Sequence, residues 1–481
     1  MSKNHSNKIV LISPPLSMDK QAGSLKDIAN VLPTLGIGYI AAVLEKNGFQ
    51  VKIIDCIGDN LYPDDVLKIL LDDPPDIIGF TATILTINAV INMSKMFRKR
   101  FPDTIFVIGG PHLTSLPEKT FEKGDFDMGI IGEGEFTLLE LAREISKGGM
   151  NFKGIKGLVY RDNGNIIVNP PRPFAEDLDS IPFPARHLYP PLHKYKPVPA
   201  SYKKLPVGLI ISSRGCPYQC TFCDRKVFGN KFRAHSPQYV VDEIEELINK
   251  HGAREIRFMD DIFTMNKKRT VDICEEILKR GIKIPWTCLA RVNAVNPDIL
   301  KKMKQAGCWQ VIYGIESGDQ NMLDKMKKGV TVEQNEQAIQ WSKDAGLNVR
   351  ATFVFGFPGE TLESIKKTVE FAKKSRLDVV NFFTLVLFPG NELYQVAKRE
   401  GTVIHEDYDQ YTSMVDTENT RLHYIPEGMT EVELKNAIRQ AYRDYYFRPS
   451  YMIRQLLSIR DIGDINRYWK AFKSITSMKK A

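Results

Sequence analysis

Residues 215–223 read Gly-Cys-Pro-Tyr-Gln-Cys-Thr-Phe-Cys, which places Cys216, Cys220 and Cys223 at the spacing C-x3-C-x2-C. The apolar run 207–211 precedes them, so the three thiols fall on one tight loop after a predicted strand. Three thiolates on such a loop can hold three irons of a cubane iron–sulfur cluster and leave the fourth iron without a protein ligand. An iron with an open position at a strand end favours chemistry over a purely structural role.

A zinc site is the alternative for these cysteines, with a distant fourth ligand such as His235. Structural zinc usually takes its ligands from paired C-x2-C elements, and this sequence has no second pair. The other four cysteines, Cys56, Cys274, Cys288 and Cys308, are scattered in apolar segments, which is typical of small buried side chains. A second cluster built from Cys274, Cys288 and Cys308 is a weaker alternative, because no short spacing joins them.

The cysteine spacing, with Gly-Cys-Pro at its start and Phe222 before the last cysteine, resembles that of the radical S-adenosylmethionine (SAM) enzymes. In that family the open iron of a 4Fe-4S cluster chelates the amino and carboxylate groups of SAM. The resemblance implies that an electron from the cluster cleaves SAM and releases a 5′-deoxyadenosyl radical. It also implies that Tyr218 and Phe222 lie at the SAM site.

The composition bounds the class of protein. A chain of 481 residues predicts two or three domains, and 43% hydrophobic with 26% charged residues are globular values. No apolar run approaches the roughly 20 residues of a membrane span, and residues 1–8 lack the apolar segment of a signal peptide, so we expect a cytoplasmic protein.

The net charge of +8 is moderate, and the basic residues form no stripe with interleaved aromatic residues. We therefore expect no nucleic-acid partner. Basic and apolar residues mix between Arg439 and Lys480. This mixture predicts a solvated helical face or, alternatively, a peripheral membrane contact.

The first part of the chain alternates short apolar strands with helical patterns such as 37–44 and 87–100. Strands are predicted at 9–12, 51–54, 76–80, 105–108 and 128–131. This alternation predicts an α/β domain over residues 1–147, a Rossmann-like doubly wound parallel sheet. The ligands of such sheets bind at the carboxyl ends of the strands.

Small and polar residues follow several of these strands, and glycines there allow a backbone to approach a large flat ligand closely. The set is similar to the cobalamin-binding domain that precedes the radical SAM domain in one subgroup, and residues 33–39 also resemble that subgroup. The resemblance implies cobalamin contacts from Thr81, Thr83, Gly109, Gly110, Pro111, His112, Gly132, Glu133 and Gly134.

The D-x-H-x-x-G motif, whose histidine ligates cobalt in the wider cobalamin-binding family, is absent, because none of the eight histidines has glycine three positions later. Many members of the subgroup share this absence, which implies cobalamin without a histidine below the cobalt. A domain that binds no cobalamin is the alternative. We expect His112 to be a turn or packing residue rather than a metal ligand.

Residues 148–205 are expected to form a connector that contains a hairpin of 158–160 and 166–168. The alternation then resumes with longer helices, and strands are predicted at 207–213, 254–259, 285–290, 309–315, 349–355 and 379–387. Six βα units predict a partial (β/α)6 barrel over residues 206–395, with its active residues at the carboxyl edge.

Resemblance to the strand-end motifs of the family places further residues at the SAM site: Asp260, Asp261, Arg291, Glu316, Ser317, Arg350 and Gly356. Asp260 or Asp261 is assigned to the SAM amino group. Glu316 and Ser317 are assigned to the amino or ribose region, and Arg291 or Arg350 to the carboxylate. A loop cap or a surface ion pair is the alternative for each.

Residues 396–481 are expected to form a small helical region, with one helix over 432–446, that closes the mouth of the barrel and helps to select the substrate. Residues 445–449 resemble the subgroup that includes the anaerobic Mg-protoporphyrin monomethyl ester cyclase and the chlorin and hopanoid methylases. The resemblance implies a cobalamin-dependent radical SAM enzyme, in the first place a C-methyltransferase that acts on an unactivated carbon. Cyclisation, rearrangement or carbon–carbon coupling, with or without cobalamin, is the alternative, and a non-catalytic sensor is a third reading.

The substrate class has only weak signals. The aromatic run 381–388 and the mixed basic and apolar tail favour an apolar or amphiphilic molecule such as a lipid or tetrapyrrole. The resemblance implies a reducing protein such as flavodoxin or ferredoxin as partner. No motif identifies a catalytic side chain.

Overall fold

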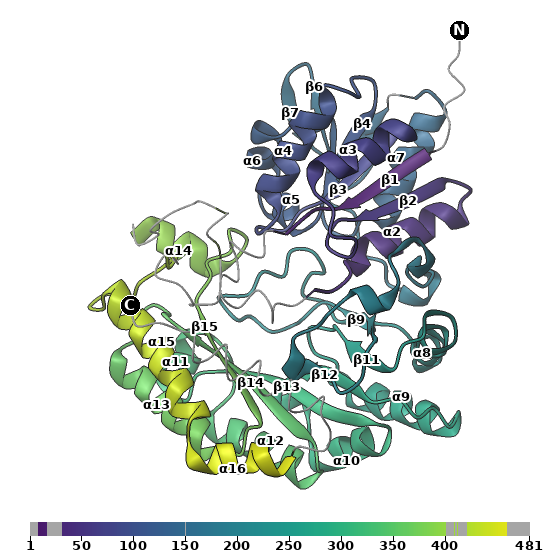
Figure 1. Cartoon of the computed structure of the whole chain (residues 1–481). Coiled ribbons are helices and arrows are strands. Elements are labelled where there is room, and N and C mark those ends of the chain that lie inside the picture. Colours follow the sequence, from purple (N-terminus) through teal and green to yellow (C-terminus); the bar gives the residue numbers. More distant parts are fainter. Residues whose placement is uncertain are drawn as a thin grey trace. The chain divides into compact units, whose positions relative to one another are not determined.

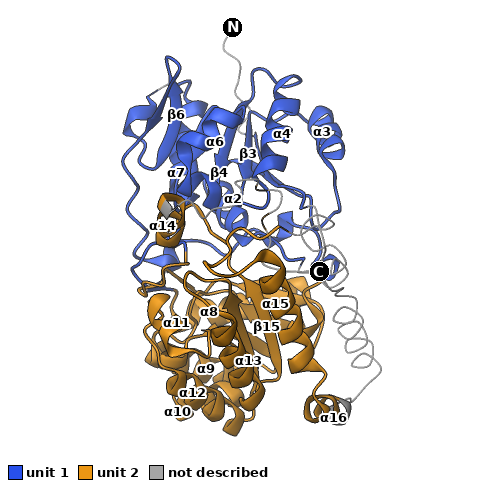
Figure 2. Cartoon of the chain, turned by 90° about the vertical axis from the view of Figure 1, so that its left-hand side faces the viewer, with its two compact units in different colours: residues 1–17, 31–195, 224–234 blue, residues 18–30, 196–223, 235–481 orange. Residues whose placement is uncertain are grey.

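The computed structural model divides the chain into two compact units, which Figures 1 and 2 show. The structure describes residues 8–16, 31–149, 151–400, 408, 411 and 421–458. Unit 1 comprises residues 1–17, 31–195 and 224–234, and unit 2 comprises residues 18–30, 196–223 and 235–481.

Unit 1 contains a seven-stranded sheet in the order β2-β1-β3-β4-β5-β6-β7. Its strands are β1 (Lys8–Ser13), β2 (Gln50–Asp55), β3 (Ile77–Thr81), β4 (Ile105–Gly109), β5 (Met128–Ile130), β6 (Leu158–Asp162) and β7 (Asn165–Val168). The strands from β1 to β5 pair in parallel, as predicted. The strands β1, β3, β4 and β5 are short apolar runs, which is typical of parallel strands covered on both faces, whereas the edge strand β2 exposes Gln50 and Lys52. The hairpin that we expected in a connector instead adds the antiparallel strands β6 and β7 to this sheet.

The helices of unit 1 connect these strands (Figure 1). They are α2 (Leu35–Lys46), α3 (Pro63–Asp72), α4 (Ile87–Arg98), α5 (Pro111–Ser115), α6 (Pro117–Lys123) and α7 (Glu135–Ser146). The segment 224–234, which ends in the short strand β10 (Arg233–Ala234), also belongs to this unit. The order of strands reverses between β1 and β3, and the ligands of such sheets bind next to that point.

Unit 2 contains a six-stranded sheet in the order β15-β14-β13-β12-β11-β8, in which every pair is parallel. Its strands are β8 (Val207–Ile210), β11 (Glu255–Phe258), β12 (Trp286–Ala290), β13 (Cys308–Glu316), β14 (Asn348–Phe355) and β15 (Val379–Thr384), and β9 (Ser213–Arg214) follows β8. The six βα units predicted from the sequence are therefore confirmed.

One helix follows most strands of unit 2, namely α8 (Pro237–His251), α9 (Lys267–Lys279), α10 (Pro297–Gln305), α11 (Gln320–Lys325), α12 (Val332–Asp344) and α13 (Leu362–Lys374). Local sequence fixes their ends. In α8, the Ser236 side chain caps the Tyr239 amide, Pro237 occupies the first turn, and Gly252 adopts a left-handed conformation after the last turn.

The chain continues with α14 (Glu392–Glu400), α15 (Glu431–Tyr446) and α16 (Pro449–Ser458). The helix α15 protects the edge strand β15, because the Tyr446 hydroxyl accepts from the Val380 amide and donates to the Val380 carbonyl. Among the described residues, no helix has the length and apolar character needed to cross a membrane. Most of the tail for which we considered a membrane contact, residues 459–481, lies outside the described residues.

Candidate functional site

The cysteine loop is anchored through its backbone. The Thr221 amide donates to the Met326 carbonyl at 3.1 Å, and the Thr221 carbonyl accepts from the Leu393 amide at 3.2 Å. The Asn391 side chain donates to the Phe222 carbonyl at 2.8 Å. These contacts hold the loop without using a cysteine side chain.

The three cysteines of the loop form no disulfide, and of them Cys220 is buried, Cys216 is half-buried and Cys223 is exposed. In the part of the chain that the structure describes, no three His, Cys, Asp or Glu side chains converge to hold one metal ion. This argues against a zinc ion shared with His235. A cubane cluster places each cysteine on a different iron, so the donors need not converge on one point. The donor set thus fits the cluster.

Arg291 brings a positive charge to this loop. Its guanidinium lies 3.7 Å from the centroid of the Tyr218 ring, and its Nη1 lies 3.8 Å from the Cys220 sulfur. Its Nε donates to Asn293, whereas its buried Nη2 has no partner among the described residues. Arg291 partly opposes the rise in the pKa of Cys216 that burial causes. The free Nη2 can also receive a carboxylate.

At the carboxyl edge of unit 1, the loops after β3 and β4 lie against each other. The Ala82 amide donates to the Gly109 carbonyl, and the Ala82 carbonyl accepts from the His112 amide. Gly110 has a φ of +97°, and a Cβ there would meet the Ala82 oxygen and the Thr81 hydroxyl at 2.8 Å. Only glycine fits both the backbone conformation and this close approach.

Comparison with known proteins adds to this geometry. Residues 210–372 match the family model of the radical SAM superfamily, and residues 24–142 match that of the B12 binding domain. An uncharacterized methyltransferase of Pyrococcus horikoshii is 35% identical over 93% of this chain and 94% of its own length. The chain belongs to the B12-binding radical SAM enzymes.

Two further comparisons fit this family. The anaerobic magnesium-protoporphyrin IX monomethyl ester cyclase of Rubrivivax gelatinosus is 28% identical over 89% of this chain and 76% of its own length. The structure of OxsB, a cobalamin-dependent SAM radical enzyme with aqua-cobalamin and SAM bound, superposes with a TM-score of 0.75. That match covers 98% of this chain and 71% of OxsB at 19% identity, and it supports the fold. As a radical SAM enzyme of this family, the protein has a 4Fe-4S cluster, SAM and cobalamin as its cofactors.

The structure separates the two aspartates that follow β11 in this radical SAM enzyme. Asp260 is 1% exposed and accepts three hydrogen bonds of 2.6 Å, from the Ser212 amide and from the hydroxyls of Ser212 and Ser213. Asp261 is exposed, and its charge contributes to the raised pKa of Cys216, which is caused mainly by burial. Asp260 therefore holds the chain before the cysteine loop, and Asp261 is the better candidate for the SAM amino group.

Glu316 lies at the end of β13 with a φ of +66°, which is unusual for a residue with a side chain. Its carboxylate forms a buried ion pair of 2.8 Å with Lys328. The Ser317 hydroxyl is already used within the protein, because it shares a hydrogen bond with Thr368 on α13 and accepts from the Asp319 amide. Lys328 was not foreseen from the sequence, in which it appears as one of several lysines.

Arg350, the other arginine considered for the SAM carboxylate, lies elsewhere in unit 2. It stands on β14, and its Nε donates to Asn381 on β15 at 2.9 Å. Through Ile312 on β13, Arg350 is in register with Leu289 on β12. Leu289 precedes Arg291 by two residues. Arg291, which contacts the cysteine loop, is therefore the better candidate for the SAM carboxylate.

Gly356 begins a turn that Glu360 holds closed. The Glu360 Oε2 accepts from the Gly356 amide at 2.5 Å and from the Phe357 amide at 3.3 Å, so the backbone donor of Gly356 is already used. The Glu360 Oε1 is buried without a partner among the described residues. Burial raises the pKa of Glu360 to about 8, and the two amides only partly oppose this rise.

The raised pKa of Glu360 predicts a pH-dependent stability. Between about 4.5 and about 8 the folded chain keeps a proton on Glu360 that the unfolded chain has lost. The free energy of unfolding should therefore fall as the pH rises through this window, with a contribution of about 1.4 kcal/mol per pH unit. Urea unfolding should show that Glu360→Gln removes this contribution. Equal pH slopes in the variant and the wild type would contradict it.

Two predicted cobalamin residues have protein partners within unit 1. His112 is buried, its Nδ1 lies 3.0 Å from the Thr120 hydroxyl, and burial lowers its pKa to about 4. It is therefore neutral, as a packing residue would be. The Glu133 carboxylate forms a buried ion pair of 2.7 Å with Arg233. This pair links the segment 224–234 to the loop after β5. Glu133 is therefore a better candidate for a structural residue than for a cobalamin contact.

The remaining predicted cobalamin residues line the ends of β3, β4 and β5. Thr83 lies in the turn before α4, where its amide donates to the Thr86 hydroxyl at 3.0 Å. Pro111 opens α5, where its missing amide hydrogen costs no helix hydrogen bond. Gly132 donates its amide to Thr114 at 3.1 Å, and Gly134 precedes the first turn of α7.

Sequence reasoning missed Asp55, at the end of β2. It is 1% exposed, and its carboxylate accepts from the Tyr195 hydroxyl at 2.6 Å and from the Ile57 amide. Burial raises its pKa despite these hydrogen bonds. A Cβ at Gly58 would meet the Tyr195 hydroxyl at 2.7 Å. The signal available in the sequence was an aspartate directly after a buried strand with glycine three residues later.

Cys274, Cys288 and Cys308 are all buried within unit 2. Burial raises the pKa of Cys274 and of Cys288, and the neighbouring Cys308 raises both further. The Cys308 thiol donates to the Gln310 carbonyl. All three are core side chains, and they do not form a second metal site among the described residues.

Proposed function

We propose that this B12-binding radical SAM enzyme is a C-methyltransferase that acts on an unactivated carbon of an apolar or amphiphilic small molecule. The observation that carries the proposal is the 35% identity to the Pyrococcus horikoshii methyltransferase, because it extends over 93% of this chain and 94% of the relative.

The residues around the cysteine loop have separable tasks in this proposal. When bound, the reduced cluster supplies the electron that cleaves SAM to a 5′-deoxyadenosyl radical, and cobalamin supplies the methyl group. Cys216, Cys220 and Cys223 hold three irons. Arg291 orients the SAM carboxylate through its free Nη2, and Asp261 receives the SAM amino group.

Cyclisation is the second candidate function, and the cyclase of Rubrivivax gelatinosus favours it at 28% identity over 89% of this chain. Both candidates begin with hydrogen abstraction from an unactivated carbon. They differ in whether a methyl group reaches the product. A lipid or a tetrapyrrole is the substrate class we propose for either, with flavodoxin or ferredoxin as the electron donor.

The test uses anaerobically reconstituted enzyme, dithionite, SAM with a deuterated methyl group, and panels of lipids and tetrapyrroles. Methylation predicts a product that carries one deuterated methyl group, together with equal amounts of 5′-deoxyadenosine and S-adenosylhomocysteine. Cyclisation predicts an unlabelled product and 5′-deoxyadenosine without S-adenosylhomocysteine. Mass spectrometry of the product therefore decides between the two, and the second result would overturn the methyltransferase proposal.

A further inference from the structure

Arg257 on β11 and Arg350 on β14 project from the same face of the unit 2 sheet. The parallel register pairs Arg257 with Thr287, Thr287 with Gln310, and Gln310 with Asn348. Paired residues of neighbouring strands share a face, and so does the residue two positions further along a strand. Arg350 stands two positions after Asn348, so it joins this row.

This face is the one opposite the helices. Trp286, next to Thr287, turns the other way and donates to the Ala306 carbonyl after α10. Tyr313 also turns the other way, and its hydroxyl shares a hydrogen bond with Ser342 on α12. Because side chains alternate along a strand, the row that contains Arg257 faces the interior of the partial barrel.

Four buried polar atoms in this row have no hydrogen-bond partner in the part of the chain that the structure describes. They are the Nε of Arg257, the Oγ1 of Thr287, the Oε1 of Gln310 and the Nη1 of Arg350. Thr287 and Gln310 are fully buried, and Arg350 is 8% exposed. Buried polar atoms are normally hydrogen-bonded, so this group points to a ligand.

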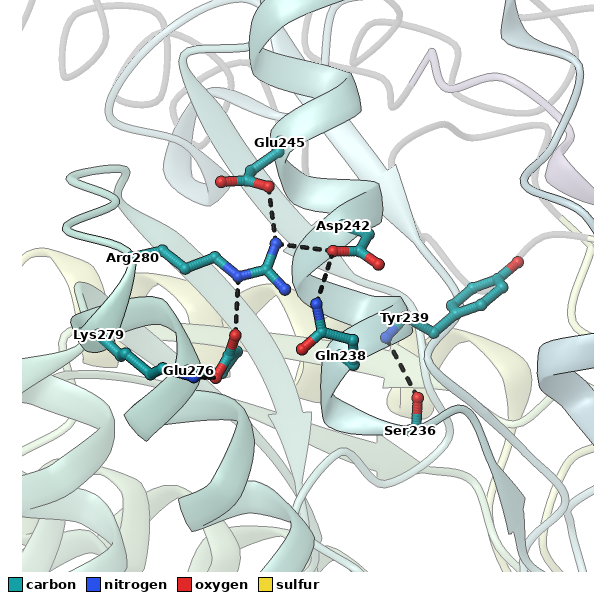
Figure 3. A network of polar contacts seen from close by, with 8 residues as sticks. All are labelled: Ser236, Gln238, Tyr239, Asp242, Glu245, Glu276, Lys279 and Arg280. Atoms are coloured by element: carbon teal, nitrogen blue, oxygen red, sulfur yellow. Dashed lines mark hydrogen bonds and ion pairs between the residues drawn. The ribbon is translucent and has the colours of Figure 1, made fainter.

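The charges indicate the kind of ligand. Burial lowers the pKa of both guanidinium groups, that of Arg257 to about 10, and the charge of Arg350 lowers the pKa of Arg257 further. Arg280 provides a contrast at the outer face of unit 2, where Asp242, Glu245 and Glu276 all bind its guanidinium (Figure 3). Glu255 raises the pKa of the half-buried Arg257, but its carboxylate already accepts hydrogen bonds from the Trp309 side chain and from the amides of Lys203 and Lys204. Among the described residues no carboxylate forms an ion pair with either guanidinium, and an oxyanion between the two would offset the cost of burying them.

We propose that Arg257, Arg350, Thr287 and Gln310 bind an oxyanion group of the substrate, a carboxylate or a phosphate. The guanidinium fork matches the oxygens of both groups. Arg350 lies two residues deeper along the strands than Arg291, so this site is separate from the cysteine loop. The substrate is then amphiphilic, with its anionic end on the sheet. This inference rests on the proposed function in one respect, which is that the bound oxyanion belongs to the substrate.

The test is calorimetric titration of the reconstituted holoenzyme with decyl phosphate and, as an uncharged match, decanol. The wild type should bind decyl phosphate at least 10-fold more tightly than decanol, and inorganic phosphate should compete. The double variant Arg257→Met/Arg350→Met should lose this preference, by roughly 10- to 100-fold per guanidinium. Equal binding of the two probes by the wild type, or an unchanged preference in the double variant, would overturn the inference.

Matched variants separate this site from a structural role. Arg280→Met removes an arginine that carboxylates already bind, and it should keep the preference for decyl phosphate. Arg257→Met removes no side-chain hydrogen bond to a described residue, so the ligand-free variant should unfold at a temperature no lower than the wild type. A large loss of thermal stability would assign Arg257 to the core instead and overturn its place in the site.

Two further outcomes distinguish the neighbouring proposals. If Arg350→Met weakens the binding of SAM and leaves that of decyl phosphate unchanged, Arg350 belongs to the SAM carboxylate and the inference fails. The calorimetric readout needs no methyl transfer. Cyclisation in place of methylation would therefore overturn the proposed function and leave the oxyanion site intact.

Discussion

The triple variant Cys216→Ala/Cys220→Ala/Cys223→Ala should bind almost no iron after anaerobic reconstitution, against about four irons per chain in the wild type. The loop backbone is held by Met326 and Leu393, so the variant should fold. Without the cluster no electron reaches SAM, and the formation of 5′-deoxyadenosine should fall below detection. Iron analysis and liquid chromatography measure the two effects.

Another cysteine of unit 2 serves as the matched control. Cys274 is buried outside the loop, and Cys274→Ala should retain the irons and the 5′-deoxyadenosine. The triple variant should also keep about one cobalamin per chain, because the residues proposed to contact cobalamin belong to unit 1. If the triple variant retained its iron and Cys274→Ala lost it, the cluster would have to be assigned to the other cysteines.

Asp260→Ala should lower the free energy of unfolding by roughly 3–5 kcal/mol. The side chain is 1% exposed, and its loss leaves the Ser212 amide, two serine hydroxyls and the nearby Arg269 charge without their acceptor. Asp260→Asn keeps the shape and should lose less. Urea unfolding of the apo-protein measures both variants.

The neighbouring Asp261→Ala should behave in the opposite way. Because Asp261 is exposed, the free energy of unfolding of this variant should stay within about 0.5 kcal/mol of the wild-type value. The affinity for SAM should fall by roughly 10- to 100-fold, which corresponds to one hydrogen bond to a charged group. Equilibrium binding of SAM by the reconstituted enzyme tests this. A loss of SAM binding in Asp260→Asn with none in Asp261→Ala would reverse the two roles.

Much of the fold could be predicted because the signals for it are local. A run such as Ile9–Ile12 is apolar at every position, and this is typical of a parallel strand with both faces covered. The sequence predicts the hairpin 158–168 as two strands. It does not predict the place of these strands in the sheet of unit 1, because their pairing with β5 depends on residues about 30 positions away.

The candidate site divides in the same way. Cys216, Cys220 and Cys223 could be found because one short loop carries all three ligands. The sequence did not indicate Lys328, Asp55 or Arg257, since each interacts with a residue on another strand or loop that is distant in the chain.

The two α/β folds, the cysteine loop and the family are predictable from the sequence, because periodicity, spacing and motif are properties of neighbouring residues. The three-dimensional fold is needed to show which of two adjacent aspartates is buried and which of two arginines contacts the cysteine loop. The pleat and the register of the parallel sheet cause this difference. They send consecutive side chains to opposite faces and bring residues far apart in the chain to one level.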